Sequence, residues 1–258
     1  MKMVVCIKQV PDTECISIDE AGGKIKRTEG DAILNPYCEY ALNFAVSMKD
    51  EKDSITVVSM GPDSARDALQ KCLELGADEA YHLKDDDFAG SDAWATATVL
   101  SRFLSSHSPD YDILFCGKIA IDGDTGQVPA ELAFLLGASQ YYHVIAWHRS
   151  GTDLVLTQDY GDELREAILK PKSVVAVGAG SNLRRFPNKA EIEKARSKNI
   201  TTLNRESLGL KGEECGRKGS LTKVSKISVF SHPRQGCRLE NVDSHDAAHS
   251  ILSKGGWI

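Results

Sequence analysis

Short apolar runs alternate with amphipathic stretches along most of the chain. An apolar run bounded by turn residues is typical of a buried strand, and apolar residues three or four positions apart are typical of a helix. The predicted strands are residues 4–10, 54–60, 80–83, 113–116 and 173–177, and the predicted helices between them are residues 36–46, 65–73, 94–103 and 130–136. Such alternation predicts an α/β fold, in which a doubly wound, mostly parallel, Rossmann-like sheet carries helices on both faces.

Local signals mark where these elements begin and end. Pro36 is tolerated in the first turn of a helix, Asp92 is a typical N-cap residue, and Gly137 is a typical helix stop. Two apolar segments around Ser150-Gly151 indicate a hairpin. Residues 12–34 are polar and contain Gly22-Gly23, which indicates a loop or an irregular hairpin.

The composition changes near the C-terminus. A charged helix is predicted over residues 189–198, and after about residue 203 the chain becomes polar and rich in glycine and lysine. A segment with so few apolar residues cannot build its own core. We therefore expect a nucleotide-binding α/β domain over residues 1–203, followed by a C-terminal arm over residues 204–258 that ends in a short helix and packs on a partner subunit.

The loop from Gly117 to Pro129 carries most of the functional information. It follows a buried strand and precedes a helix, which is the ligand-binding position of open α/β sheets. Small residues at a helix start let an anionic group approach backbone N–H groups. Asp122, Asp124 and Gln127 add side chains suited to sugar hydroxyls or to the edge of a base. The loop lacks the spacing of a P-loop or of a dinucleotide fingerprint, so a plain surface loop explains it as well.

Composition and charge exclude several classes of protein. The net charge of −6 over 258 residues argues against a general nucleic-acid binder. No apolar run approaches the roughly 18 residues of a membrane span, and the apolar N-terminal stretch is too short for a signal peptide. The seven cysteines form no CxxC pair, which favours a reducing cytoplasm. His245 and His249 lack a third ligand, so no metal site is assigned, and no nucleophile–base pair indicates a catalytic residue.

Several segments, taken in order, resemble the beta subunit of electron-transfer flavoproteins. They are the opening strand and loop at residues 5–12, the Asn-Pro-aromatic helix start at 35–41, the turn at 61–62, the Leu-Gly-Ala-Asp segment at 75–78 and the loop at 117–127. The resemblance is specific over about residues 3–140 and weakens afterwards. Arg184 stands where the family has proline, and the anchoring leucine of the family's partner-recognition loop falls at Lys189.

The resemblance implies a heterodimer with an alpha subunit that carries an electron-transferring FAD. The beta subunit of this family binds AMP, or, in electron-bifurcating relatives, a second FAD that NADH reduces. The implied partners are a flavin dehydrogenase, such as one of the acyl-CoA dehydrogenase type, and a quinone reductase or ferredoxin as acceptor. Lysine at position 189 argues against the usual acyl-CoA dehydrogenase partner.

Carried over residue by residue, the resemblance also implies a nucleotide site. Its cofactor-binding residues are Cys6, Asn35, Pro36, Tyr37, Cys38, Met60, Gly117, Lys118, Ile119, Ala120, Ile121, Asp122, Gly123, Asp124, Thr125, Gly126, Gln127 and Val128. We expect FAD rather than AMP, because residues 122–128 and 88–96 resemble the bifurcating relatives and Gly123 leaves room beside a pyrophosphate. The alternative function is a non-redox adenine-nucleotide-binding module or a hydrolase of the same α/β type.

Overall fold

The computed structural model describes residues 1–12, 17–19, 24–26, 32–181, 184–225 and 242–254. The chain forms two compact units, Met1–Ser225 and Lys226–Ile258. The first unit contains an α/β core, and the second contains helix α7 (Ser244–Lys254). Within the described residues, no helix combines the length and the apolar character needed to cross a membrane.

One large sheet forms the centre of the first unit. Among the described residues it has nine strands in the order β11-β10-β9-β12-β8-β1-β6-β7-β13. Their bounds are β1 Lys2–Ile7, β6 Ser54–Met60, β7 Glu79–Leu83, β8 Ile113–Gly117, β9 Ser139–Ser150, β10 Asp153–Asp159, β11 Leu164–Ile168, β12 Ser173–Val177 and β13 Ile200–Leu203. All neighbouring strands from β9 through β12, β8, β1, β6 and β7 to β13 pair in parallel. Beyond β9, the strands β10 and β11 continue the sheet in antiparallel pairing. The predicted doubly wound, mostly parallel sheet is confirmed.

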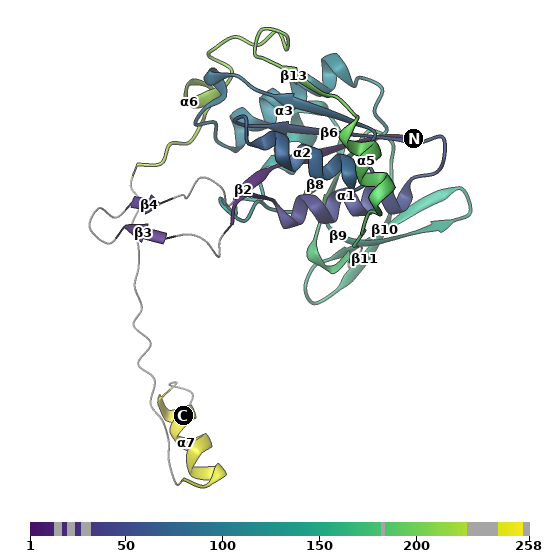
Figure 1. Cartoon of the computed structure of the whole chain (residues 1–258). Coiled ribbons are helices and arrows are strands. Elements are labelled where there is room, and N and C mark those ends of the chain that lie inside the picture. Colours follow the sequence, from purple (N-terminus) through teal and green to yellow (C-terminus); the bar gives the residue numbers. More distant parts are fainter. Residues whose placement is uncertain (13–16, 20–23, 27–31, 182–183, 226–241, 255–258) are drawn as a thin grey trace. The chain divides into compact units, whose positions relative to one another are not determined.

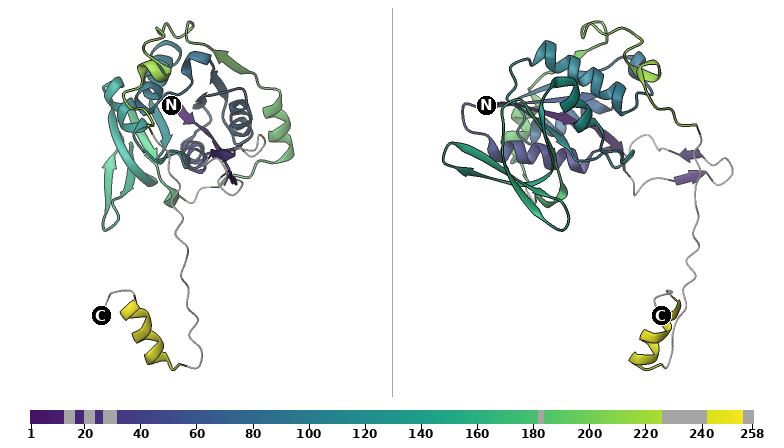
Figure 2. Two further views of the ribbon diagram at one scale, coloured as in Figure 1. Left: turned by 90° about the vertical axis from the view of Figure 1, so that its left-hand side faces the viewer. Right: turned by 180° about the vertical axis from the view of Figure 1, so that it is seen from behind.

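Helices cover both faces of this sheet (Figures 1 and 2). Their bounds are α1 Pro36–Met48, α2 Ala65–Glu74, α3 Ala93–His107, α4 Val128–Leu136, α5 Lys189–Arg196 and α6 Gly216–Gly219, with 3-10 turns η2 Asp86–Phe88 and η3 Ala179–Ser181. Side chains alternate between the faces along a strand. In β1, Met3, Val5 and Ile7 therefore join the core under α1, α2 and α5, whereas Val4 and Cys6 join the core under α3 and α4.

The structure refines several of the predicted boundaries. The run at 4–10 divides into β1 and β2 (Gln9–Pro11), and β2 pairs antiparallel with β5 (Ala32–Leu34). Between them in the sequence, β3 (Ser17–Asp19) pairs antiparallel with β4 (Lys24–Lys26), and residues 13–16, 20–23 and 27–31 of the predicted loop lie outside the described residues. The hairpin at Ser150-Gly151 is confirmed as β9–β10. The next strand, β11, pairs with β10 and was not predicted, because most of its side chains are exposed and its sequence shows no hydrophobic pattern.

The first compact unit extends past residue 203, where the composition changes, as far as Ser225. Leu208, Leu210 and Cys215 are 2%, 3% and 1% exposed and belong to the core under α3 and α4. A few apolar residues in a polar segment thus attach it to the domain. The expected terminal helix is present as α7, and the packing of an arm on a partner subunit stays a prediction.

Candidate functional site

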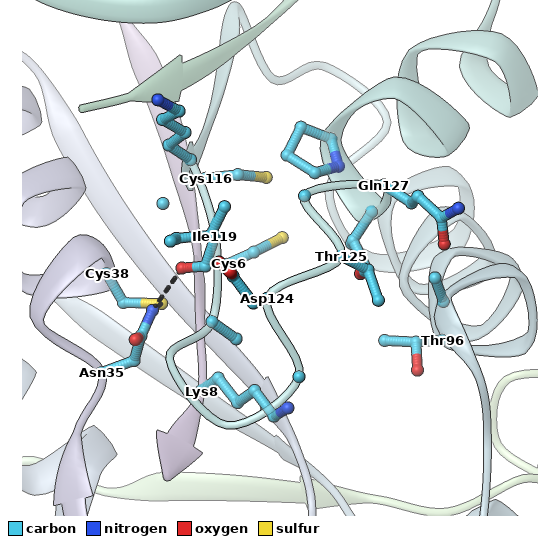
Figure 3. A pocket seen from close by; sticks show the side chains of 18 of the residues that line it. Cys6, Lys8, Asn35, Cys38, Thr96, Cys116, Ile119, Asp124, Thr125 and Gln127 are labelled. Atoms are coloured by element: carbon cyan, nitrogen blue, oxygen red, sulfur yellow. Dashed lines mark hydrogen bonds between the residues drawn. The ribbon is translucent and has the colours of Figure 1, made fainter. Parts of the chain in front are cut away.

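The order of the strands places a crevice at one end of the sheet. From β1 the chain passes through α1 to β6 on one side, and from β7 it returns through α3 to β8 on the other side. Connections that leave in opposite directions open a crevice at the carboxyl ends of the strands, where open α/β sheets bind ligands. A cavity of about 280 Å³ lies here, against Cys6 and Ile7 of β1 and Cys116 and Gly117 of β8 (Figure 3).

Two walls and a floor make up this pocket. One wall is the loop after β8, from Gly117 to Gln127, and a second wall is the start of α3, from Ser91 to Thr96. In Figure 3, Thr96, Thr125 and Gln127 occupy one side of the view, and Asn35 and Cys38 occupy the other. The N-termini of α3 and α4 both border the cavity. No side chain caps α4, so its N-terminal N–H groups and helix dipole favour an anionic group in this position, whereas the Asp92 carboxylate already caps α3.

Three buried thiols form the floor. Cys6 and Cys116 are register neighbours across β1 and β8, and Cys38 lies in the first turn of α1. A hydrogen bond with Cys6, followed by burial, raises the pKa of Cys116 well above its ordinary value. Burial also raises the pKa of Cys38. Raised pKa values keep Cys38 and Cys116 protonated at neutral pH, so they offer a ligand neutral thiols and no thiolate nucleophile.

Asn35 fixes the position of the loop. It is fully buried, and its side-chain Nδ2 donates to the Ile119 carbonyl at 2.9 Å and contacts Cys38 Sγ at 3.2 Å. Its Oδ1 accepts from the Ile121 N–H at 3.3 Å. The backbone N–H of Asn35 donates to the Lys8 carbonyl at 2.9 Å. Asn35 therefore ties the end of β1, the start of α1 and the ligand loop to one another.

Glycines in the loop serve different purposes. A Cβ on Gly117 would lie 2.7 Å from the carbonyl carbon of Tyr37, so this glycine lets α1 pack closely on the end of β8. Gly126 has φ +62°, a backbone conformation that favours glycine. At Gly123, a Cβ would meet no atom of the described residues within 4 Å, so the space there is open.

Carboxylates near the pocket have contrasting environments. Asp122 forms an ion pair with Lys8, whose Nζ lies 2.7 Å from Oδ1, and so its carboxylate is already engaged. Asp92 Oδ1 accepts from the Ala95 N–H at 2.9 Å and caps α3. Glu131 Oε2 is buried without a hydrogen-bond partner among the described residues. Burial, followed by the charge of Asp92, raises the pKa of Glu131.

The structure brings most of the sequence-predicted site residues into this pocket. Those that line it are Cys6, Asn35, Cys38, Gly117, Lys118, Ile119, Ala120, Gly123, Asp124, Thr125, Gly126, Gln127 and Val128. Pro36, Tyr37, Met60, Ile121 and Asp122 are outside the lining formed by the described residues. Pro36 and Tyr37 begin α1, and Met60 packs on the core under α3 and α4.

Other lining residues were not assigned to the site from the sequence. They are Ile7, Lys8, Ser91, Asp92, Ala93, Thr96, Leu100, Cys116 and Pro129. Asp92 was predicted only as a helix cap. The resemblance of residues 88–96 to bifurcating relatives was the available signal for the α3 wall.

Comparison with known proteins identifies relatives over nearly the whole chain. The family model of the electron transfer flavoprotein domain matches residues 22–208. The electron transfer flavoprotein subunit beta of Megasphaera elsdenii is 35% identical over 257 residues, covering 96% of this chain and 94% of the relative. Protein FixA of Azotobacter vinelandii is 35% identical, with 98% and 92% covered. The caffeyl-CoA reductase-Etf complex subunit CarD of Acetobacterium woodii is 33% identical, with 98% and 97% covered.

The matched residues of the family model include both walls of the pocket, whereas β1 precedes them. The chain belongs to the electron transfer flavoprotein family, as a relative of its beta subunits.

Proposed function

We propose that the chain is the beta subunit of a heterodimeric electron-transfer flavoprotein and holds an adenine nucleotide in the pocket at the ends of β1 and β8. In this role it helps to pass electrons between a flavin dehydrogenase and a downstream acceptor. The observation that carries the proposal is the convergence of the Gly117–Gln127 loop and the α3 start on one cavity at the strand-order reversal. Family membership supports the electron-transfer role.

The chemistry of the lining fits an adenine nucleotide. Protonated thiols and the aliphatic part of the lining, including Leu100, suit a planar base, and Asp124, Thr125 and Gln127 offer partners for ribose hydroxyls. The uncapped N-terminus of α4 suits the phosphates. A cavity of about 280 Å³ lies near the lower end of the roughly 300–1,000 Å³ of small-molecule sites. This chain would therefore hold a mononucleotide-sized portion, and the remainder of an FAD would extend beyond the cavity.

We favour a second FAD over AMP. The open space at Gly123 leaves room for a pyrophosphate to continue along the loop, which a larger side chain would restrict. A bound FAD would supply the ability to accept a hydride from NADH. The protein's own residues would position the adenylate half of the FAD. Asp124 and Gln127 would contact it directly, and Asn35 would act indirectly by holding the loop in place.

The dehydrogenase partner is proposed to differ from the usual acyl-CoA dehydrogenase. Lys189 begins α5 and is exposed, and Asn188 and Glu191 form a capping box that fixes this helix start. A lysine here presents a charge where the family presents an apolar anchor. We infer a dehydrogenase with a complementary acidic surface, and a quinone reductase or ferredoxin as the acceptor.

The deciding experiment measures flavin stoichiometry. The chain is co-expressed with its alpha subunit, and the complex is analysed for flavin, AMP and NADH oxidation. Two FAD per heterodimer with NADH-dependent bleaching supports the bifurcating type. One FAD and one AMP without NADH oxidation rejects the second flavin but keeps the carrier function. A colourless protein that binds or hydrolyses only AMP or ATP supports the non-redox alternative.

A further inference from the structure

A segment near the end of the first compact unit crosses the start of α3. We call residues 214–222 the strap; it includes the short helix α6 (Gly216–Gly219). Its helix contacts both α3 and η2, and Figure 1 shows α6 next to α3. The strap is therefore fixed to the same helix start that forms one wall of the ligand pocket.

Asp92 joins the strap to the pocket wall. One carboxylate oxygen, Oδ1, accepts from the Ala95 N–H and caps α3 at 2.9 Å. The other, Oδ2, accepts from the Thr222 N–H at 2.7 Å and from the Thr222 hydroxyl at 2.9 Å. The backbone N–H of Asp92 donates to Ser220 Oγ at 2.9 Å. The backbone N–H and the Oδ2 atom of Asp92 thus both bond to the strap, while Asp92 also borders the cavity.

A second connection lies one residue earlier. Ser91, also in the pocket lining, accepts through Oγ from the Gly216 N–H at 3.1 Å and donates to the Phe88 carbonyl at 2.8 Å. Gly216 has φ +59°, and a Cβ there would lie 2.1 Å from the Asp87 carbonyl oxygen. Any side chain at position 216 would therefore push the strap away from η2 and from the wall.

Asp92 is in the protonation state that accepts these hydrogen bonds. Burial acts to raise its pKa, but the hydrogen bonds from Ala95 and Thr222 outweigh burial and hold the pKa below its ordinary value. The side chain is therefore a carboxylate at neutral pH and accepts all three bonds. Hydrogen bonds to a charged acceptor are stronger than those between neutral groups.

We propose that the strap sets the position of the α3 wall, with Asp92 as the positioning residue, so that ligand binding in the pocket is coupled to the order of residues 214–222. The identity of the ligand as an adenine nucleotide rests on the proposed function. Coupling between two sites is reciprocal: an ordered strap tightens ligand binding, and a bound ligand orders the strap by the same factor.

The test uses Thr222, which contacts Asp92 and is outside the described pocket lining. In the purified full-length complex, Thr222→Val removes the hydroxyl bond, Thr222→Ser keeps it, and Thr201→Val changes an exposed threonine of β13 as a control. AMP and FAD are the probes, and their dissociation rates are measured. We expect Thr222→Val to speed release about threefold to tenfold, less than the full value of one charge-assisted bond, because Asp92 keeps its bonds from the Thr222 and Ala95 N–H groups. Thr222→Ser and Thr201→Val should stay within about twofold of the wild type.

A second readout measures the reverse effect. Addition of AMP to the wild-type complex should slow amide hydrogen exchange at Thr222 and Gly216, and Thr222→Val should weaken this protection. Equal dissociation rates in all variants, or no protection of the strap on binding, would overturn the coupling. A wild-type protein that binds neither AMP nor FAD would instead reject the proposed nucleotide function, which separates the two failures.

Discussion

At the scale of single residues, the two aspartates of the ligand loop have different surroundings. Asp124 lines the cavity, whereas Asp122 is paired with Lys8 and lies outside the described lining. Asp124→Ala should therefore weaken nucleotide binding about tenfold, the equivalent of about 1.4 kcal/mol for a lost hydrogen bond to a charged group. Gln127→Ala should act in the same direction. Equilibrium dialysis with AMP measures both, and Asp122→Ala is the matched control with the smaller expected effect.

Retention of nucleotide at wild-type affinity in both Asp124→Ala and Gln127→Ala would contradict the assignment of the loop. An equal loss in Asp122→Ala would show that the Lys8 ion pair shapes the loop and that the distinction between the two aspartates is wrong. The sequence predicted all of these residues as ligand contacts. It could not separate them, because the lysine that pairs with Asp122 is more than a hundred positions away in the chain.

Glu131 is predicted to make stability depend on pH. Burial and the nearby Asp92 raise its pKa, so ionisation costs more in the folded chain than in the unfolded chain. Its contribution to stability is full below the unfolded-state pKa and is lost as pH rises through the folded-state pKa. Glu131→Gln should therefore raise the Tm at pH 7, and the gain should shrink toward pH 4. Glu193→Gln, an exposed change on α5, is the control, and a gain that does not vary with pH would contradict the explanation.

At the scale of elements, hydrophobic pattern predicted the parts of the fold that are buried on both faces. β12 follows from the continuous apolar run at residues 174–177, and β6 from the β-branched run at residues 55–58, because helices cover both sides of a parallel strand. β11 has no such pattern, since most of its side chains are exposed. The wall at α3 was also missed. The sequence predicted Asp92 as the N-cap of α3. It did not predict that α3 and α4 approach one cavity, because this depends on the order of the strands in the sheet, which no local sequence pattern encodes.

Asn35 connects elements that are far apart in the sequence, and its removal should affect all of them. Asn35→Ala leaves the buried Ile119 carbonyl and the Ile121 N–H without these partners, which should cost about 1–3 kcal/mol of unfolding free energy. Asn35→Asp keeps the acceptor for Ile121 but loses the donor to Ile119. Urea unfolding compares the three proteins, with AMP affinity as a second measurement. Wild-type stability in Asn35→Ala would show that the loop holds its position without this side chain.

At the scale of the whole molecule, the chain has a core that continues past the change in composition. Composition indicated a boundary near residue 203, but Leu208, Leu210 and Cys215 are buried in the core under α3 and α4. Three apolar residues spread over a polar segment are too sparse to form a periodic pattern, so the sequence did not reveal their burial. Truncation after residue 203 would remove these residues and leave cavities in that core. Such a truncation would therefore test stability rather than partner binding.

A cut after Ser225 tests the arm without disturbing the core. The second unit, Lys226–Ile258, contains α7, on which Ile251 and Leu252 are exposed. Exposed apolar residues on an amphipathic helix suit burial against another protein. We expect residues 1–225 to unfold at nearly the wild-type Tm but to lose co-purification with the alpha subunit. Ile251→Ser with Leu252→Ser in the full chain should weaken the complex in the same direction, and His249→Ala on the same helix is the control. A truncated chain that still forms a stable 1:1 complex would show that the partner binds the first unit instead.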